Sequence, residues 1–173
     1  MSKLLPSIAV VAGGFCLAAA SAAAAVLGPE AADCARGSGK AAMLVRVVGL
    51  KSRTGVVRVQ SYGGDPANYF SKGAYLQRIE VRPPAAGPVE VCVPVPHDGV
   101  YAASVRHRLE SGSRLRDGGG LSGNPEVSLM DALFRRKPSP VQVQVRVRGV
   151  TRVPVTMNYV QGASLKPIPA MED

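Results

Sequence analysis

The sequence contains no tryptophan, and aromatic residues make up only 5% of its 173 residues. Because few large rings are available, we expect a modest core built mainly from aliphatic side chains. The chain also has only two histidines, His97 and His107, and three cysteines. A structural metal site needs about four well-placed ligands, which the two histidines and the distant cysteines Cys34 and Cys92 do not plausibly supply. The composition therefore predicts neither a metal site nor a cofactor.

The sequence also lacks the short motifs of common enzyme classes. It has no phosphate-binding loop, no dinucleotide-binding fingerprint and no cofactor-binding lysine motif. Several serines occur near His107, but none lies in a G-x-S-x-G nucleophile elbow. We therefore expect no catalytic residues, although a hydrolase that uses His107 remains the alternative.

Acidic residues are scarce: 12 Asp and Glu stand against 21 Lys and Arg, which gives a formal net charge of +9. A surface of this kind attracts polyanions. The densest cluster is Arg135, Arg136 and Lys137, and further arginines follow at positions 146, 148 and 152. The alternative is that the net charge only keeps the domain soluble.

A long apolar run occurs at the N-terminus. Lys3 precedes residues 4–20, which carry no charge, and residues 18–25 are nearly all alanine. This pattern is typical of a signal peptide, and we predict cleavage between residues 22 and 25 and a periplasmic or secreted protein. An uncleaved membrane anchor is the disfavoured alternative, and no later segment is apolar enough to span a bilayer.

Removing the signal peptide (1–25) leaves two cysteines, Cys34 and Cys92. In an oxidising compartment they are expected to form a disulfide, with two unpaired thiols as the alternative. Such a bond would fix a polar leader (26–42) that has little else to hold it. We expect the folded domain to follow at 43–162 and a flexible tail at 163–173.

Short valine-rich runs with period two dominate the chain after Met43, and glycine, proline, aspartate and asparagine separate them. In residues 141–148 every second residue is valine, so one face should be buried. The predicted strands are 43–48, 56–62, 76–82, 89–95, 100–107, 141–148 and 153–160. About seven such strands predict an all-β, antiparallel β-sandwich, with a small closed barrel as the alternative.

Two short helical turns are expected between the strands. The first begins at Asp65–Pro66, an N-cap followed by proline, and ends near Gly73. The second covers 128–134, where Ser128 and Asp131 have the spacing of a capping box. In this turn we expect Leu129, Leu133 and Phe134 to reach the core.

Several short motifs occur along the chain: Gly99 and Tyr101 in a turn, Val105 and His107 at a strand end, the segments 120–124 and 131–134, and a last strand that ends at Tyr159. Together they resemble the motifs of a bacterial family known as domain of unknown function 2141. The resemblance implies an exported immunoglobulin-like or transthyretin-like sandwich, and it carries no established activity. Tyr101 resembles a tyrosine corner, and we interpret both Tyr101 and His107 as structural.

Members of this family commonly continue after the histidine with a series of Asp and Asn residues, oxygen ligands suited to a hard cation. Here the aligned positions include Arg108, Arg114 and Arg116, which would repel calcium. A glycine run follows whose backbone N–H groups could form a concavity for an anion. The candidate anion-binding residues are Arg108, Arg114, Arg116, Gly118, Gly119 and Gly120, and the alternative is a solvated loop.

Together these observations favour an exported, non-catalytic domain with a binding or structural role in the bacterial cell envelope. Its expected partners are anionic envelope components, namely lipopolysaccharide, anionic lipid or acidic polysaccharide, rather than nucleic acid.

Overall fold

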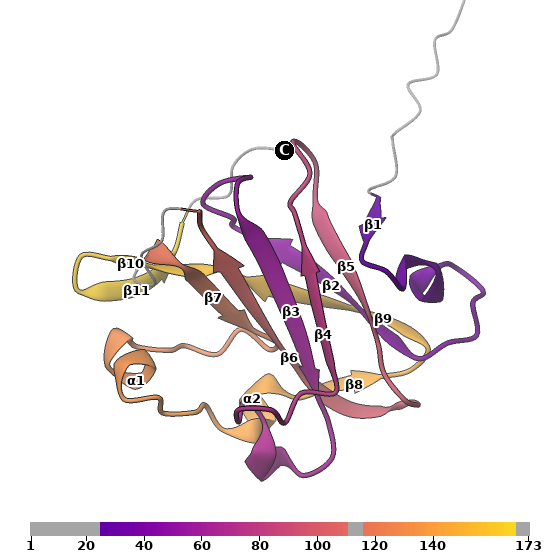
Figure 1. The fold of residues 1–173 in the computed structure, drawn as a ribbon. Coiled ribbons are helices and arrows are strands. Elements are labelled where there is room, and N and C mark those ends of the chain that lie inside the picture. The colour runs from indigo at the N-terminus through magenta and orange to yellow at the C-terminus, as the bar shows by residue number, and fades with distance from the viewer. Residues whose placement is uncertain (1–24, 111–115, 169–173) are drawn as a thin grey trace, which may run out of the picture.

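The computed structural model describes residues 25–110 and 116–168. Two β-sheets pack against each other over one core, and only short helical segments connect the strands (Figure 1). The all-β prediction is confirmed. The predicted signal peptide lies almost entirely in residues 1–24, outside the described part of the chain. Within the described residues, no helix is long and apolar enough to cross a membrane.

The first sheet has four strands in the order β1-β5-β2-β9. Their bounds are β1 (Val26–Leu27), β5 (Val89–Pro94), β2 (Ala42–Val48) and β9 (Val150–Thr156). The second sheet has the order β11-β10-β7-β6-β3-β4, and β8 pairs with β6 off this path. Its strands are β11 (Ser164–Pro167), β10 (Asn158–Gln161), β7 (Gly118–Leu121), β6 (Gly99–Arg108), β3 (Val56–Tyr62), β4 (Gln77–Val81) and β8 (Val145–Val147).

The sequence predicts a purely antiparallel sandwich, but the structure contains two parallel strand pairs. β9 runs parallel to β2, with Val45 opposite Val153, and β1 runs parallel to β5. Parallel neighbours require a long crossover connection rather than a hairpin. Here the chain between β2 and β9 supplies this connection, and it contains five of the seven strands of the second sheet, β3, β4, β6, β7 and β8.

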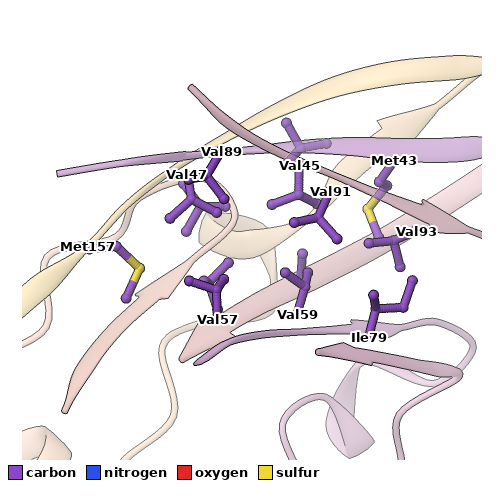
Figure 2. Close-up of a cluster of buried hydrophobic side chains, with 14 of the residues drawn as sticks. Met43, Val45, Val47, Val57, Val59, Ile79, Val89, Val91, Val93 and Met157 are labelled. Carbon is purple, nitrogen blue, oxygen red and sulfur yellow. The ribbon is translucent and has the colours of Figure 1, made fainter. Parts of the chain in front are cut away.

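The core is aliphatic, as expected from the shortage of aromatic residues. Alternate residues of each strand point inward, so the valines of β2 and β5 face those of β3 across the sandwich (Figure 2). The core residues labelled there are Met43, Val45, Val47, Val57, Val59, Ile79, Val89, Val91, Val93 and Met157.

Residues 141–148 do not form the single strand that their alternation predicts. The segment begins with the helical turn α2 (Pro140–Val143), and β8 follows. Pro140 occupies the first helical position, and the Gln142 side chain accepts a hydrogen bond from the Ser139 N–H at 3.1 Å. These local helix-start signals outweigh the alternation. As a result Val143 is buried while Val141 is 82% exposed.

The predicted strand 153–160 is divided between the two sheets. The chain leaves the first sheet after β9 and enters the second at β10, and Met157 lies between them, fully buried. The Met157 N–H donates to the Val48 carbonyl at 2.8 Å, which fixes this crossing point. The tail predicted to be flexible instead continues as β11, which pairs with β10 over 164–167. Residues 169–173 lie outside the described part.

The leader is attached to the first sheet by the predicted disulfide. Cys34 ends the short helix η1 (Ala31–Cys34) and is bonded to Cys92 of β5, with the two Cα atoms 5.7 Å apart. Both cysteines are buried together with Ala42 and Leu44, outside the main core. The disulfide therefore covers the outer face of the first sheet with the leader.

Both predicted helical turns are present, but one faces a different way than expected. In η2 (Pro66–Asn68) the Asp65 carboxylate accepts from the Ala67 N–H at 3.0 Å. In α1 (Leu129–Leu133) the Ser128–Asp131 capping box forms as predicted. However, Leu133 and Phe134 do not reach the core, because α1 lies on an excursion of the chain beside the sheets (Figure 1) and leaves them 69% and 61% exposed.

Candidate functional site

His107 lies at the end of β6, where that strand meets β10 and the loop between β2 and β3. Its ring is completely buried. Nε2 lies 2.8 Å from the carbonyl oxygen of Thr54, and Nδ1 lies 2.7 Å from the hydroxyl oxygen of Tyr159. A carbonyl oxygen can only accept, so we assign the ring proton to Nε2. Nδ1 then accepts a hydrogen bond from Tyr159.

The network continues from Tyr159 to the backbone. The Tyr159 hydroxyl oxygen accepts a hydrogen bond from the Lys51 N–H at 3.1 Å, and the tyrosine ring is 1% exposed. Burial raises the pKa of Tyr159 to about 12 and lowers the pKa of His107 below its ordinary value. Both side chains are therefore neutral near pH 7, and each polar atom of the pair has a partner.

This arrangement does not place His107 for acid–base catalysis. A general base needs a ring nitrogen within hydrogen-bond reach of the substrate proton. Here both nitrogens are directed at internal partners, and the ring has no exposed surface. A nearby serine, Ser122, is equally occupied, because it is buried and its hydroxyl donates to the Val143 carbonyl at 2.5 Å. The geometry thus counts against the hydrolase alternative.

Tyr101 lies near the opposite end of β6. Its ring is 3% exposed, and its hydroxyl donates to the carbonyl oxygen of His97 at 2.8 Å, four residues earlier in the chain. This is the geometry of a tyrosine corner, in which a buried ring ties a turn to a strand. The two residues interpreted as structural thus lie at the two ends of one strand and contact different turns.

The structure describes two of the three candidate anion-binding arginines, Arg108 and Arg116. Arg108 is paired with Glu80 at 2.9 Å, and Arg58 contacts the same carboxylate at 2.6 Å. Arg116 is exposed. Arg114 lies outside the described residues. Arg108 therefore already has an internal carboxylate partner, which it shares with Arg58.

The glycines of this segment form a strand rather than the flexible loop predicted from the sequence. In β7, Gly118 pairs with His107 and Gly120 pairs with Val105 of β6. A Cβ atom on Gly118 would overlap the ring of Tyr159, and one on Gly120 would lie 2.5 Å from the Thr156 carbonyl oxygen. Gly118 and Gly120 are thus needed because residues of β10 and β9 pack directly on the backbone of β7.

Asp117 joins the two ends of the loop that precedes β7. Its carboxylate accepts from the Leu109 N–H at 3.3 Å and lies 4.0 Å from the guanidinium of Arg106. In the described parts of the chain, no group of three or more His, Cys, Asp and Glu residues is close enough to hold a metal ion. Among the described residues of the 107–125 segment, Gly118 lies against the ring of Tyr159, whose hydroxyl is hydrogen bonded to His107.

One surface feature was missed because Leu133 and Phe134 were assigned to the core. We name it the α1 tip: Met130, Leu133, Phe134, Arg135, Arg136 and Lys137. Its three apolar side chains are 54%, 69% and 61% exposed, and three consecutive cations follow them. The basic run that directly follows the apolar residues is the sequence signal that could have distinguished this turn from a core element.

The structure is a two-sheet β-sandwich that contains one disulfide and a buried, hydrogen-bonded pair formed by His107 and Tyr159. The chain belongs to the family DUF2141, described as an uncharacterized protein conserved in bacteria, whose model matches residues 45–153. That range extends from β2 into β9 and includes the α1 tip. No curated protein and no solved structure matches the chain.

Proposed function

We propose that this protein is an exported, non-catalytic domain that has a binding or structural role in the bacterial cell envelope and contacts anionic polymers or lipids there. The observation that carries the proposal is the burial of His107 with both ring nitrogens hydrogen bonded, which leaves this residue a structural role. The formal net charge of +9 supports an anionic partner.

The compartment follows from the apolar N-terminal run and from the disulfide. Disulfides persist in oxidising compartments such as the periplasm, and a domain with a modest aliphatic core gains stability from one. The disulfide between Cys34 and Cys92 in the structure supports this location. Lipopolysaccharide, anionic lipid and acidic polysaccharide are the polyanions available there.

We also propose that the sandwich is immunoglobulin-like or transthyretin-like. The tyrosine corner at Tyr101 and the central antiparallel pairing of β3 with β6 support this assignment. The added strands β7, β10 and β11 extend the second sheet beyond a minimal seven-stranded arrangement.

Binding of the purified domain to an acidic polysaccharide resin and to anionic vesicles, compared with neutral resin and neutral vesicles, tests this function. We expect retention on the anionic materials that weakens steeply with added salt, because opposite charges at the surface are screened. Equal elution from anionic and neutral supports would contradict the proposal. Ester or glycoside turnover that disappears in a folded His107→Gln variant would instead favour the hydrolase.

A further inference from the structure

The α1 tip exposes apolar side chains on one helical face. Met130, Leu133 and Phe134 have the i, i+3 and i+4 spacing that places side chains side by side along a helix. They are among the most exposed large hydrophobic residues of the described chain. Figure 1 shows α1 beside the sheets, on a long excursion between β7 and β8. The apolar face therefore has no partner within the sandwich.

The exposure of this face is a property of a well-capped helix rather than of a frayed end. At the start, the Asp131 N–H donates to the Ser128 hydroxyl at 3.0 Å, and the Ser128 N–H donates to the Asp131 carboxylate at 3.2 Å. At the end of the helix, the N–H of Arg136 donates to the Asp131 carbonyl at 2.8 Å, and the N–H of Arg135 donates to the Ala132 carbonyl at 3.3 Å. These two backbone hydrogen bonds form a Schellman motif.

Arg135 occupies the position of the Schellman motif that glycine usually fills. Its φ of 54° lies in the left-handed region, which disfavours residues with a side chain. Its guanidinium makes no hydrogen bond or ion pair with any residue that the structure describes. Arg135 thus exposes its positive charge to solvent, although the left-handed backbone conformation at this position favours glycine.

The other two cations have partners within the described chain, and Arg136 lies against the apolar face. The Arg136 guanidinium lies 5.7 Å from the centre of the Phe134 ring and 3.7 Å from the Asp131 carboxylate. Lys137 donates to the Ser71 hydroxyl at 2.6 Å, which connects the end of the tip to the loop after η2. The tip therefore presents a fixed apolar face bordered by positive charge.

We propose that the α1 tip is a docking surface for a membrane that contains anionic phospholipid. Apolar side chains bordered by cations match the boundary between acyl chains and negatively charged head groups. A soluble acidic polysaccharide would satisfy the cations but would leave Leu133 and Phe134 in water. The inference rests on the proposed function, because it assigns one anionic partner to one surface.

The absence of tryptophan in the chain allows a direct test. The experiment uses the chain from residue 25, because the apolar residues 1–24 would bind lipid themselves and both sheets lie within 26–167. A Phe134→Trp variant is titrated with phosphatidylglycerol–phosphatidylcholine vesicles and with phosphatidylcholine vesicles. We expect a blue shift of its emission with the anionic vesicles and little with the neutral ones. A Leu76→Trp variant, at an exposed position outside the tip, should show no shift.

Vesicle sedimentation with matched variants separates the apolar and the charged contributions. Arg135→Gln/Arg136→Gln should weaken binding about fivefold for each cation removed. The control Arg146→Gln/Arg148→Gln removes the same charge from exposed positions outside the tip and should retain most of the binding. Leu133→Ser/Phe134→Ser should weaken binding at least about tenfold. Arg135→Gly should weaken binding without lowering the melting temperature.

The outcomes distinguish this inference from the proposed function. If the wild type binds neither anionic vesicles nor acidic polysaccharide, the proposed function fails and the inference fails with it. If the wild type binds both, but the tip variants bind vesicles as the wild type does, only the inference is overturned. Equal binding to phosphatidylcholine vesicles, or a tip-dependent dimer that binds no vesicles, would also overturn it.

Discussion

The hydroxyl oxygen of Tyr159 lies 2.7 Å from Nδ1 of His107, and both side chains are buried at the end of the sandwich. Through Lys51 and Thr54 the pair also binds two backbone groups of the loop between β2 and β3. Three segments that are distant in sequence are thus joined by one satisfied polar network. Buried polar groups that are all paired specify one arrangement of the surrounding chain.

Replacing Tyr159 with phenylalanine should destabilise the protein. The change removes the donor to His107 Nδ1 and the acceptor of the Lys51 N–H, and it leaves buried polar atoms without partners. We expect the free energy of unfolding to fall by about 1–3 kcal/mol, as measured by urea denaturation. Tyr75→Phe is the control, because the Tyr75 hydroxyl has no hydrogen-bond partner among the described residues. Equal midpoints for the two variants would argue against a structural role for the network.

His107 should make the stability depend on pH. Burial lowers its pKa in the folded state below the ordinary value of 6.5, so between the two pKa values the unfolded chain binds the proton and the folded chain does not. The contribution of His107 to the free energy of unfolding is therefore fully present above about pH 6.5. It decreases as the pH falls toward the folded-state pKa. Urea denaturation across this range measures the effect. A His107→Gln variant should lose this component of the slope, whereas His97→Gln, at an exposed position, should keep it.

The strands in the first part of the sandwich could be predicted because their alternation reflects burial directly. Residues 43–48, 56–62 and 89–95 were predicted almost to the boundary, since each has one face in the core. The prediction failed at 141–148, where the Ser139–Pro140 helix start competes with the same alternation. Period-two patterning gives the face of a strand only where no local capping signal opposes it.

The contacts of the candidate site were much harder to predict. His107 and Tyr159 are 52 residues apart, and no local pattern shows that their side chains meet. The same holds for Gly118, whose role depends on a ring that arrives from β10. A glycine run reads as a flexible loop in sequence, although here close packing of another strand is what requires it. Leu133 and Phe134 were assigned to the core because apolarity alone does not distinguish a core face from a binding face.

The disulfide between Cys34 and Cys92 should contribute strongly to stability. It closes a sequence separation of 58 residues, for which the chain-entropy model gives roughly 4 kcal/mol. A Cys34→Ser/Cys92→Ser variant should therefore unfold at a lower urea concentration, by about 2–4 kcal/mol in free energy. Intact-mass measurement before and after reduction provides the check on the bond itself. Two titratable thiols in the unreduced protein, or an unchanged midpoint in the variant, would count against this role.

The glycines of β7 offer a matched pair that separates packing from loop flexibility. Gly118 lies under the Tyr159 ring and is buried, so an added Cβ has no space. Gly119 is the next residue, is exposed, and an added Cβ would meet no atom within 4 Å. We expect Gly118→Ala to cost about 1–3 kcal/mol or more through overpacking, whereas Gly119→Ala should change stability by less than about 0.5 kcal/mol.

Thermal or urea unfolding of Gly118→Ala and Gly119→Ala side by side provides the measurement. If the glycines served only loop flexibility, the two substitutions would have similar effects, and that result would contradict the packing role. A Gly118→Ala/Tyr159→Leu double variant sharpens the test. Because leucine removes the ring that the new methyl group overlaps, the double variant should lose less than the sum of the two single changes.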